Sequence, residues 1–390
     1  MVGCAAEGSS TPGPDSSAQV PAMLAPPGAG PGTYVVMTRP PNVPANYMTT
    51  PSGYFDPSCV VEVGANERVQ LDGTLAKLDG TAPRPVHRCA SPAYDVQGRE
   101  IHGMEPISVL PPRLEPDAPD DQALPPTING WISYEDSTTL GNISYLHAQW
   151  TVPTTPSNSD GQTVYFFPGL ENKESSSTTI LQPVLGFNQD YGPAGWSLAS
   201  WNCCSGSNPT LWHSSFLAVT AGSTVSGDMQ GSSCNTTTGV CPNWSIISRI
   251  GTAGSSVTLN TTTTLAMDWV FSAVLECYSI DTCNELPAST SDVFSGFSIR
   301  NAAGTTLSIP AWGLHPGTSL SPSCSYTATK TATTATLGWA TAGQVCTPGD
   351  DRACCPFQNG CSCDGDQICK ADGSGWGACM GAGQAGHPCP

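Results

Sequence analysis

Basic residues are scarce in this chain of 390 residues: 13 Lys and Arg stand against 31 Asp and Glu, and the formal net charge is −18. Without a basic patch that neutralises phosphates, binding to nucleic acid or to an anionic membrane is disfavoured. The sequence also has no run of about eighteen apolar residues, so no membrane-spanning helix is predicted. Its acidic, lysine-poor composition is typical of a secreted protein that works at low pH.

Two common hydrolase motifs are also absent. The sequence contains neither G-x-S-x-G nor H-E-x-x-H, so α/β-hydrolase and zinc-peptidase chemistry have no local support. The 18 cysteines include no C-x-x-C pairs completed by histidines, which favours disulfides made in an oxidising compartment over zinc. We therefore predict an exported protein that uses no metal and no other cofactor.

The two ends of the chain differ in composition from its middle. Met1–Cys4, followed by a stretch rich in Ser, Pro, Gly and Ala, resembles the end of a bacterial lipoprotein signal. We predict a lipid on Cys4, a flexible tether over 1–32, and a bacterial protein that is secreted or lipid-anchored on the cell surface. Residues 341–390 carry eight cysteines and predict a disulfide-rich module that attaches to a cell surface or matrix. We expect a monomer.

Residues 33–126 have the pattern of a small β-rich unit. Short alternating runs such as TYVVM and CVVEV are separated by Asn, Gly and Pro, and only Cys59 and Cys89 are available there to pair with each other. The unit ends in the Pro- and Asp-rich stretch 111–126. We interpret 33–126 as a prosegment and hinge, which would make the chain a zymogen whose prosegment covers an acidic cleft.

Residues 127–340 consist of short strand-like runs about every ten residues, without a helical period. This spacing predicts an all-β fold, an antiparallel two-sheet β-sandwich of the jelly-roll or concanavalin-like kind. The expected disulfides of this domain are Cys234–Cys241, Cys277–Cys283 and a bond from Cys324 to either Cys203 or Cys204.

One predicted strand, Asp268–Ile280 (DWVFSAVLECYSI), places a carboxylate among apolar residues. At the two-residue period of a strand, Val274, Glu276 and Tyr278 share one face, and Leu275 falls on the other. Burying an ionised glutamate is costly unless a partner compensates its charge. We therefore expect Glu276 to line a wet groove or to have a shifted pKa.

Several motifs of this domain carry a family resemblance. In chain order they are Asn129-Gly130-Trp131, HAQWTVPT (147–154), FFPGLEN (166–172), ILQPVLGF (180–187) and VLECYSI (274–280). In this order and spacing they resemble the glutamic peptidases called eqolisins, which are acid proteases built on a two-sheet β-sandwich. The resemblance spans almost all of 127–340 and implies a secreted acid endopeptidase.

The resemblance implies two catalytic residues. The glutamine of the family's I-L-Q strand falls on Gln182, and the second glutamate of its E-F-I-x-E-D strand falls on Glu276. Three further positions of the family border the substrate cleft. Trp131 matches an early tryptophan, Glu171 stands where the family has an aspartate, and Phe167 replaces the tryptophan of the same turn.

The chemistry of these residues agrees with the resemblance. Amide hydrolysis needs a base for the proton of water and a donor for the oxygen that becomes negative. Glu276 supplies the base and Gln182 the donor, and a glutamate titrates near about 4.3, which suits work in acid. Trp196 and Trp201 are candidate walls for a bound peptide. Pro183, directly after the glutamine, suggests a bulge or a sheet edge.

Two other functions remain open. Glu276 and Glu171 could be the two carboxylates that flank a sugar in a glycoside hydrolase. A non-catalytic lectin-like or adhesion module would use the tryptophans as sugar platforms and needs no catalytic residue. Degradation of a protein or peptide substrate at acid pH would separate the peptidase from both alternatives.

Overall fold

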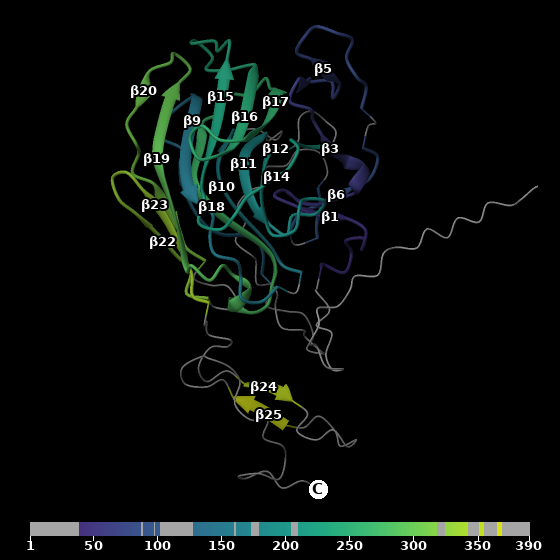
Figure 1. The fold of residues 1–390 in the computed structure, drawn as a ribbon, viewed down its shortest axis with the longest axis vertical. Coiled ribbons are helices and arrows are strands. Elements are labelled where there is room, and N and C mark those ends of the chain that lie inside the picture. Colours follow the sequence, from purple (N-terminus) through teal and green to yellow (C-terminus); the bar gives the residue numbers. More distant parts are fainter. Residues whose placement is uncertain are drawn as a thin grey trace, which may run out of the picture. The chain divides into compact units, whose positions relative to one another are not determined.

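The computed structural model describes residues 39–86, 89–96, 98–101, 128–159, 161–172, 179–203, 210–317, 324–341, 351–354 and 365–368. The predicted all-β sandwich is confirmed, because most of the strands in the described ranges belong to two large sheets that face each other (Figure 1). The helices within these ranges are two 3-10 turns, Pro57–Cys59 and Cys283–Glu285. Neither is long or apolar enough to cross a membrane.

The first large sheet carries the candidate functional site. Its strands follow the order β21-β8-β18-β10-β11-β12-β13-β3, and β14 pairs with β12. Neighbours are antiparallel except β13 and β3, which are parallel. The strands are β3 (Val60–Glu62), β8 (Ile128–Ser137), β10 (Thr163–Glu171), β11 (Ile180–Phe187), β12 (Trp196–Cys203), β13 (Leu211–His213), β14 (Leu217–Ala218), β18 (Trp269–Ile280) and β21 (Gly313–His315).

The second large sheet closes the sandwich. Its order is β22-β23-β19-β9-β15-β16-β17-β4-β5, and β20 pairs with β19. The strands are β4 (Glu67–Val69), β5 (Leu75–Lys77), β9 (Ile143–Thr151), β15 (Thr224–Ser232), β16 (Asn243–Ile250), β17 (Ser256–Thr262), β19 (Ser291–Asn301), β20 (Thr306–Leu307), β22 (Thr327–Lys330) and β23 (Ala335–Gly338).

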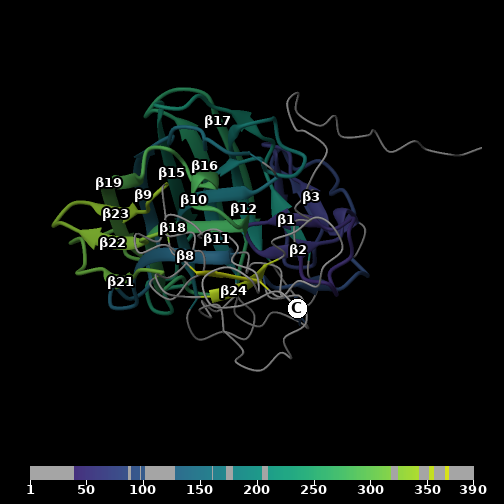
Figure 2. The ribbon, with the colours of Figure 1, turned by 90° about the horizontal axis from the view of Figure 1, so that it is seen from below.

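The main core lies between these two sheets (Figure 2). In β11, Leu181 and Leu185 point into this core, where they join Trp150 of the facing sheet. The alternate residues Ile180 and Val184 belong to a second apolar cluster on the opposite, outer face of the first sheet. The alternation of a strand therefore fixes which residues of β11 reach the outer face.

Pro183 does not make β11 an edge strand. β11 pairs with β12 along its whole length and with β10 on its other side. The ladder to β10 is interrupted where Pro183 lies, and β10 has a register shift there between Phe167 and Gly169. The missing N–H of the proline thus falls where the ladder is already irregular. The proline ring packs over Gly227 of the facing sheet.

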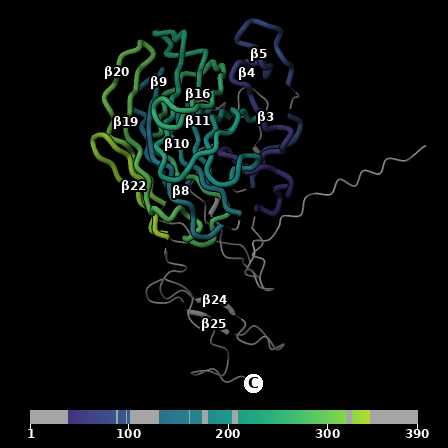
Figure 3. Tube along the Cα trace, in the orientation of Figure 1, coloured from purple at the N-terminus to yellow at the C-terminus, as the bar shows by residue number. Residues whose placement is uncertain are grey.

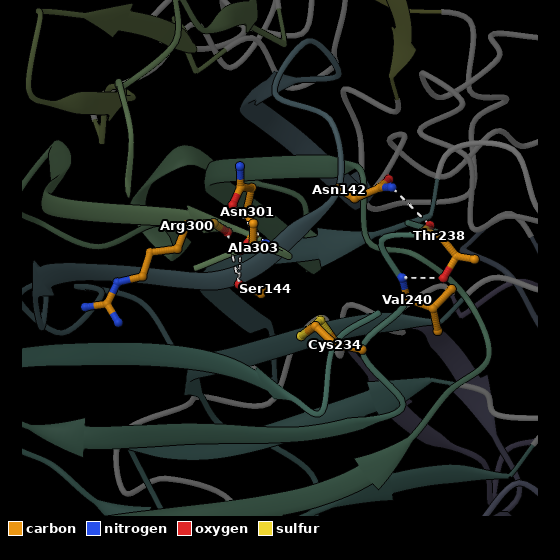
Figure 4. Close-up of a disulfide and its surroundings, with 9 residues drawn as sticks. Asn142, Ser144, Cys234, Thr238, Val240, Arg300, Asn301 and Ala303 are labelled. Atoms are coloured by element: carbon orange, nitrogen blue, oxygen red, sulfur yellow. Dashed lines mark hydrogen bonds between the residues drawn. A yellow bond between two sulfur atoms is a disulfide. The ribbon is translucent and has the colours of Figure 1, made fainter. Parts of the chain in front are cut away.

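Two predicted disulfides are present. Cys59–Cys89 lies in the N-terminal part of the chain, and Cys234–Cys241 closes a short loop after β15. Figure 4 shows how Asn142 fixes this loop: its Nδ2 atom donates to the carbonyl oxygen of Thr238, at 3.2 Å.

The predicted Cys277–Cys283 disulfide is wrong. Cys277 is a buried free thiol on the core face of β18, and Cys283 bonds to Cys324. The expected bond from Cys324 to Cys203 or Cys204 is therefore also wrong, and Cys203 forms another disulfide. Proximity in sequence was a poor guide because the fold brings Cys283 and Cys324 together in the main core, although 41 residues separate them in sequence.

The described residues of 39–101 are divided between three sheets. Figure 3 labels β3, β4 and β5 in the purple to blue part of the tube. Residues 39–101 supply β3, β4 and β5 to the two large sheets and form a separate four-stranded sheet of order β1-β2-β6-β7. We call this separate sheet the cover sheet. Its strands are β1 (Met48–Thr50), β2 (Gly53–Phe55), β6 (Ala93–Tyr94) and β7 (Glu100–Ile101).

Several predicted features lie outside the described residues. These are the lipid site Cys4, the tether 1–32, the hinge 111–126 and most of the cysteine-rich module 341–390. Within that module the structure describes one antiparallel hairpin, made of β24 (Asp351–Cys354) and β25 (Gly365–Ile368).

Candidate functional site

Three polar side chains project from the outer face of the first sheet. Gln182 alternates with Leu181 of the main core, Glu171 with Leu170, and Glu276 with Leu275. Because successive side chains of a strand point to opposite faces, all three lie on the outer face. All three are also fully buried.

The side chain of Gln182 has no hydrogen-bond partner within the described ranges. Its neighbour in β12 is Trp201, whose ring contacts those of His213 and Phe216. On its other side it stands opposite Gly169 of β10, which has no side chain. Neither the Nε2 nor the Oε1 atom of Gln182 has a hydrogen-bond partner among the described residues. A buried amide without a hydrogen-bond partner lowers the stability of the folded chain by on the order of 1–3 kcal/mol.

Glu171 lies beside this glutamine. Leu170 pairs with Leu181, so Glu171 and Gln182 occupy diagonal positions on adjacent strands, with Cα atoms about 7–8 Å apart. Neither carboxyl oxygen of Glu171 has a hydrogen-bond partner in the described part of the chain. Burial raises the pKa of Glu171 to about 8.

Gly169 contributes no side chain between these two groups. A Cβ atom added there would first meet the Phe271 ring at 3.4 Å and the Leu181 carbonyl oxygen at 3.6 Å, which are ordinary contacts. A carboxyl group and a carboxamide therefore flank a position without a side chain, above an aromatic ring.

Glu276 has different surroundings. It pairs with Tyr165 of β10 and with Trp131 of β8. The Tyr278 hydroxyl donates to its Oε1 atom at 2.8 Å, and its Oε2 atom has no partner among the described residues. Burial raises the pKa of Glu276 to about 8, although Tyr278 and the nearby indole of Trp131 lower it.

The structure does not bring Gln182 and Glu276 together. Gln182 is opposite Gly169, and Glu276 is opposite Tyr165, four residues along the same strand. At about 3.3 Å per residue this is roughly 13 Å along the sheet, with β10 lying between them as well. Phe167 lies between the two positions on the same face. One water molecule cannot contact both side chains in this conformation.

The carboxyl pair of the glycosidase hypothesis is also widely separated. Glu276 pairs with Tyr165, which lies six residues before Glu171 in β10. This corresponds to about 20 Å, whereas glycosidase carboxyl groups lie about 5–10 Å apart. The geometry does not support this alternative.

The predicted aromatic residues divide between the two faces of the first sheet. Trp131, Phe167 and Trp201 belong to the outer face with Gln182. Trp196 instead packs in the main core between the sheets, and it is not part of the site, because its position in β12 has the opposite parity to that of Trp201.

Sequence reasoning missed Gly169 and Tyr278. The glycine carried a signal, since a glycine inside a strand often marks a bulge or a close approach. Tyr278 shares the face of Glu276, two residues further along. No group of three or more His, Cys, Asp and Glu residues that could hold a metal occurs within the described ranges.

No family model matches the chain, and no curated protein matches it. Two solved structures of scytalido-glutamic peptidase, one with a peptide-based transition state analog and one with a transition state analog inhibitor, are similar at 12% and 13% sequence identity. Each has a TM-score of 0.40, and each alignment covers 55% of this chain and all of the other. The roles of individual residues therefore rest on this chain's own geometry.

Proposed function

We propose that the chain is the exported precursor of an acid endopeptidase in which Gln182 and Glu171 act on one peptide bond. The observation that carries the proposal is the pair of buried side chains whose four polar atoms have no partner among the described residues. Their desolvation is unfavourable in the resting chain, and a bound substrate and water would supply the missing partners.

The roles follow from the chemistry of the two groups. Glu171 takes a proton from water, which then attacks the carbonyl carbon of the peptide bond. The Nε2 group of Gln182 donates to the oxygen that becomes negative. The protonated carboxyl of Glu171 returns its proton to the leaving amine, which restores the starting state.

The pKa of Glu171 fits work in acid once the site is open. Burial holds it at about 8 in the closed chain. Access of water removes the desolvation, so the pKa returns toward the ordinary value near about 4.3. Above that pH the carboxylate is charged and serves as a base, whereas a histidine in acid would already be protonated.

The choice of Glu171 over Glu276 rests on distance. Glu171 is a diagonal neighbour of Gln182, whereas Glu276 is two strands and four residues away. Trp201 lies beside Gln182 and would form a wall for the substrate.

The test is digestion of denatured casein between pH 2 and 6 by the acidified full chain, before and after specific cleavage within 102–127. We expect Gln182→Ala and Glu171→Gln each to lower the rate about 100-fold or more. The exposed control variants Gln230→Ala and Glu62→Gln should retain the full rate.

Glu276→Gln decides the assignment of the base. We expect this variant to keep activity within about threefold of the parent, since Glu276 does not reach the Gln182 position. Loss of activity in Glu276→Gln together with an active Glu171→Gln would contradict our assignment. A parent chain that never cleaves would favour a binding module on the same fold.

A further inference from the structure

We infer that residues 39–101 contain two parts that are attached in different ways: β3, β4 and β5 are permanent strands of the sandwich, and the cover sheet is a separate layer on the face that carries Glu276, able to open without unfolding the sandwich. The division into two parts rests on contacts alone.

The permanent part is joined to the sandwich by backbone ladders. β3 runs parallel to β13, with Val60 paired to Leu211, and the N–H of Val63 donates to the carbonyl of His213 at 2.8 Å. β4 runs parallel to β17 at the edge of the other sheet. The segment therefore covers the outer sides of β13 and β17, and β3 and β5 become the edge strands at these ends of the two sheets.

Side chains strengthen the same junction. Val63, Val69 and Leu75 are fully buried in the main core, among residues of both sheets. The Nδ2 group of Asn260 in β17 donates to two carbonyl oxygens of the segment, and the hydroxyl of Thr262 donates to the carbonyl of Val69 at 2.9 Å. Removing this part would expose apolar surface and leave buried polar groups unpaired.

An ionic cluster around the buried Glu67 carboxylate fixes the permanent part internally. The Glu67 carboxylate accepts hydrogen bonds from Arg84 at 2.9 Å and from Lys77 at 2.7 Å. These groups lower the pKa of Glu67 to about 2. The Glu67 carboxylate therefore stays charged above that pH.

The cover sheet is attached in another way. Within the described residues its four strands pair with one another and with no strand of the sandwich. Individual hydrogen bonds to side chains of the sandwich hold it instead. The N–H of Gly53 donates to the Tyr278 hydroxyl at 3.0 Å, the Tyr165 hydroxyl donates to the carbonyl of Thr49 at 3.1 Å, and the Thr49 N–H donates to Asp190 at 2.6 Å.

Aromatic packing completes this contact. Tyr54 lies edge-on to Tyr278, with ring centroids 5.4 Å apart, and Phe55 is fully buried in the same outer cluster. The chain of donors from Gly53 through Tyr278 ends on the Glu276 carboxyl. Glu276 is thus part of the surface that binds the cover sheet.

Gly53 offers a way to disturb the cover sheet alone. Its φ is +101°, and an added Cβ would lie 2.2 Å from the backbone oxygen of Tyr94 in β6. Any side chain there must distort the contact between β2 and β6. Gly73, in the turn between β4 and β5, also has a positive φ, of +80°, but nothing lies within 4 Å of its added Cβ.

Amide hydrogen exchange of the full chain tests the division, with Gly53→Ala compared with Gly73→Ala and the parent. We expect exchange in 48–55 and 93–101 to accelerate at least tenfold in Gly53→Ala, while 60–77 and the strands of the sandwich stay within about twofold. Gly73→Ala should accelerate only its own turn. Equal acceleration of 48–55 and 60–77, or no acceleration in either, would overturn the inference.

Cleavage at a specific protease site inserted within 102–127 tests whether β3, β4 and β5 stay in the sandwich. After the cut, we expect the N-terminal fragment to co-elute with the sandwich in size-exclusion chromatography without denaturant. Release of the fragment from a sandwich that stays folded would contradict a permanent role for β3 to β5. Neither experiment measures hydrolysis, so failure of the peptidase proposal and failure of this inference are distinguishable.

Discussion

Glu171 and Glu276 lie on the same face of one sheet, and burial raises the pKa of both to about 8. They differ in their partners. Glu276 accepts a hydrogen bond from Tyr278, which in turn accepts one from Gly53 of the cover sheet. The side-chain polar atoms of Glu171 and of its neighbour Gln182 have no hydrogen-bond partner among the described residues.

Glu276 takes part in the hydrogen bonds that hold the cover sheet, whereas the side chains of Glu171 and Gln182 make no hydrogen bond among the described residues. A buried polar atom without a partner lowers stability, and natural structures contain few of them. Glu171 and Gln182 both lack hydrogen-bond partners and both lie beside Gly169. A role in binding or reaction explains this arrangement better than packing does. Glu276 has a structural explanation that Glu171 lacks.

The largest expected effect is on the pH dependence of stability. The folded pKa of about 8 for each glutamate exceeds the unfolded value near 4.5, so the folded chain holds protons that the unfolded chain has released between these pH values. The free energy of unfolding should therefore fall, on the order of several kcal/mol, as pH rises from about 4.5 to 8.

Urea denaturation at pH 4.5, 6 and 8 measures this slope. Glu171→Gln and Glu276→Gln should each flatten it, because the neutral amide has no proton to lose. If the curves of the two variants coincide with that of the parent, both glutamates are ionised in the folded chain and the comparison fails.

A smaller effect is expected from Gly169→Ala. The added methyl group meets Phe271 and the Leu181 carbonyl at ordinary distances, so the free energy of unfolding should change by less than about 1 kcal/mol. The methyl occupies the space between Gln182 and Glu171, so hydrolysis should fall at least tenfold. Casein digestion and urea denaturation of the same sample check both parts. An unchanged rate would place the substrate elsewhere on this face.

The smallest effect is expected from Tyr278→Phe. It removes the donor to Glu276 and the acceptor for the Gly53 N–H, at a cost of about 1 kcal/mol. Urea denaturation at pH 5 should detect this loss, and exchange of the Gly53 amide should accelerate. Hydrolysis should not fall. A strong loss of hydrolysis would show that the reaction takes place around Glu276 instead.

The sequence was sufficient for the fold class and for the faces of the key strands. Alternation within ILQPVLGF and VLECYSI places Gln182 and Glu276 on one face, as expected. It could not supply the register of β11, β10 and β18, which depends on long-range pairing and on the shift between Phe167 and Gly169. That register decides which glutamate lies beside Gln182.

The remaining differences have the same origin. Cys283 bonds to Cys324, which is distant in sequence, and nearby Cys277 stays a free thiol. The N-terminal strands were expected in a separate prosegment, but β3 and β4 join sheets whose partner strands come much later in the chain. Local patterns contain no information about such partners.

The two parallel ladders of the N-terminal segment also determine the order in which the protein can assemble. Val60 pairs with Leu211, and Arg68 pairs with Asn260. During synthesis the N-terminal strands leave the ribosome first, yet their partners emerge only about 150 and about 190 residues later. Pairings over such long stretches of chain form slowly. The earliest described part of the chain is therefore among the last to reach its place, and until then the edges of both sheets stay open to other chains.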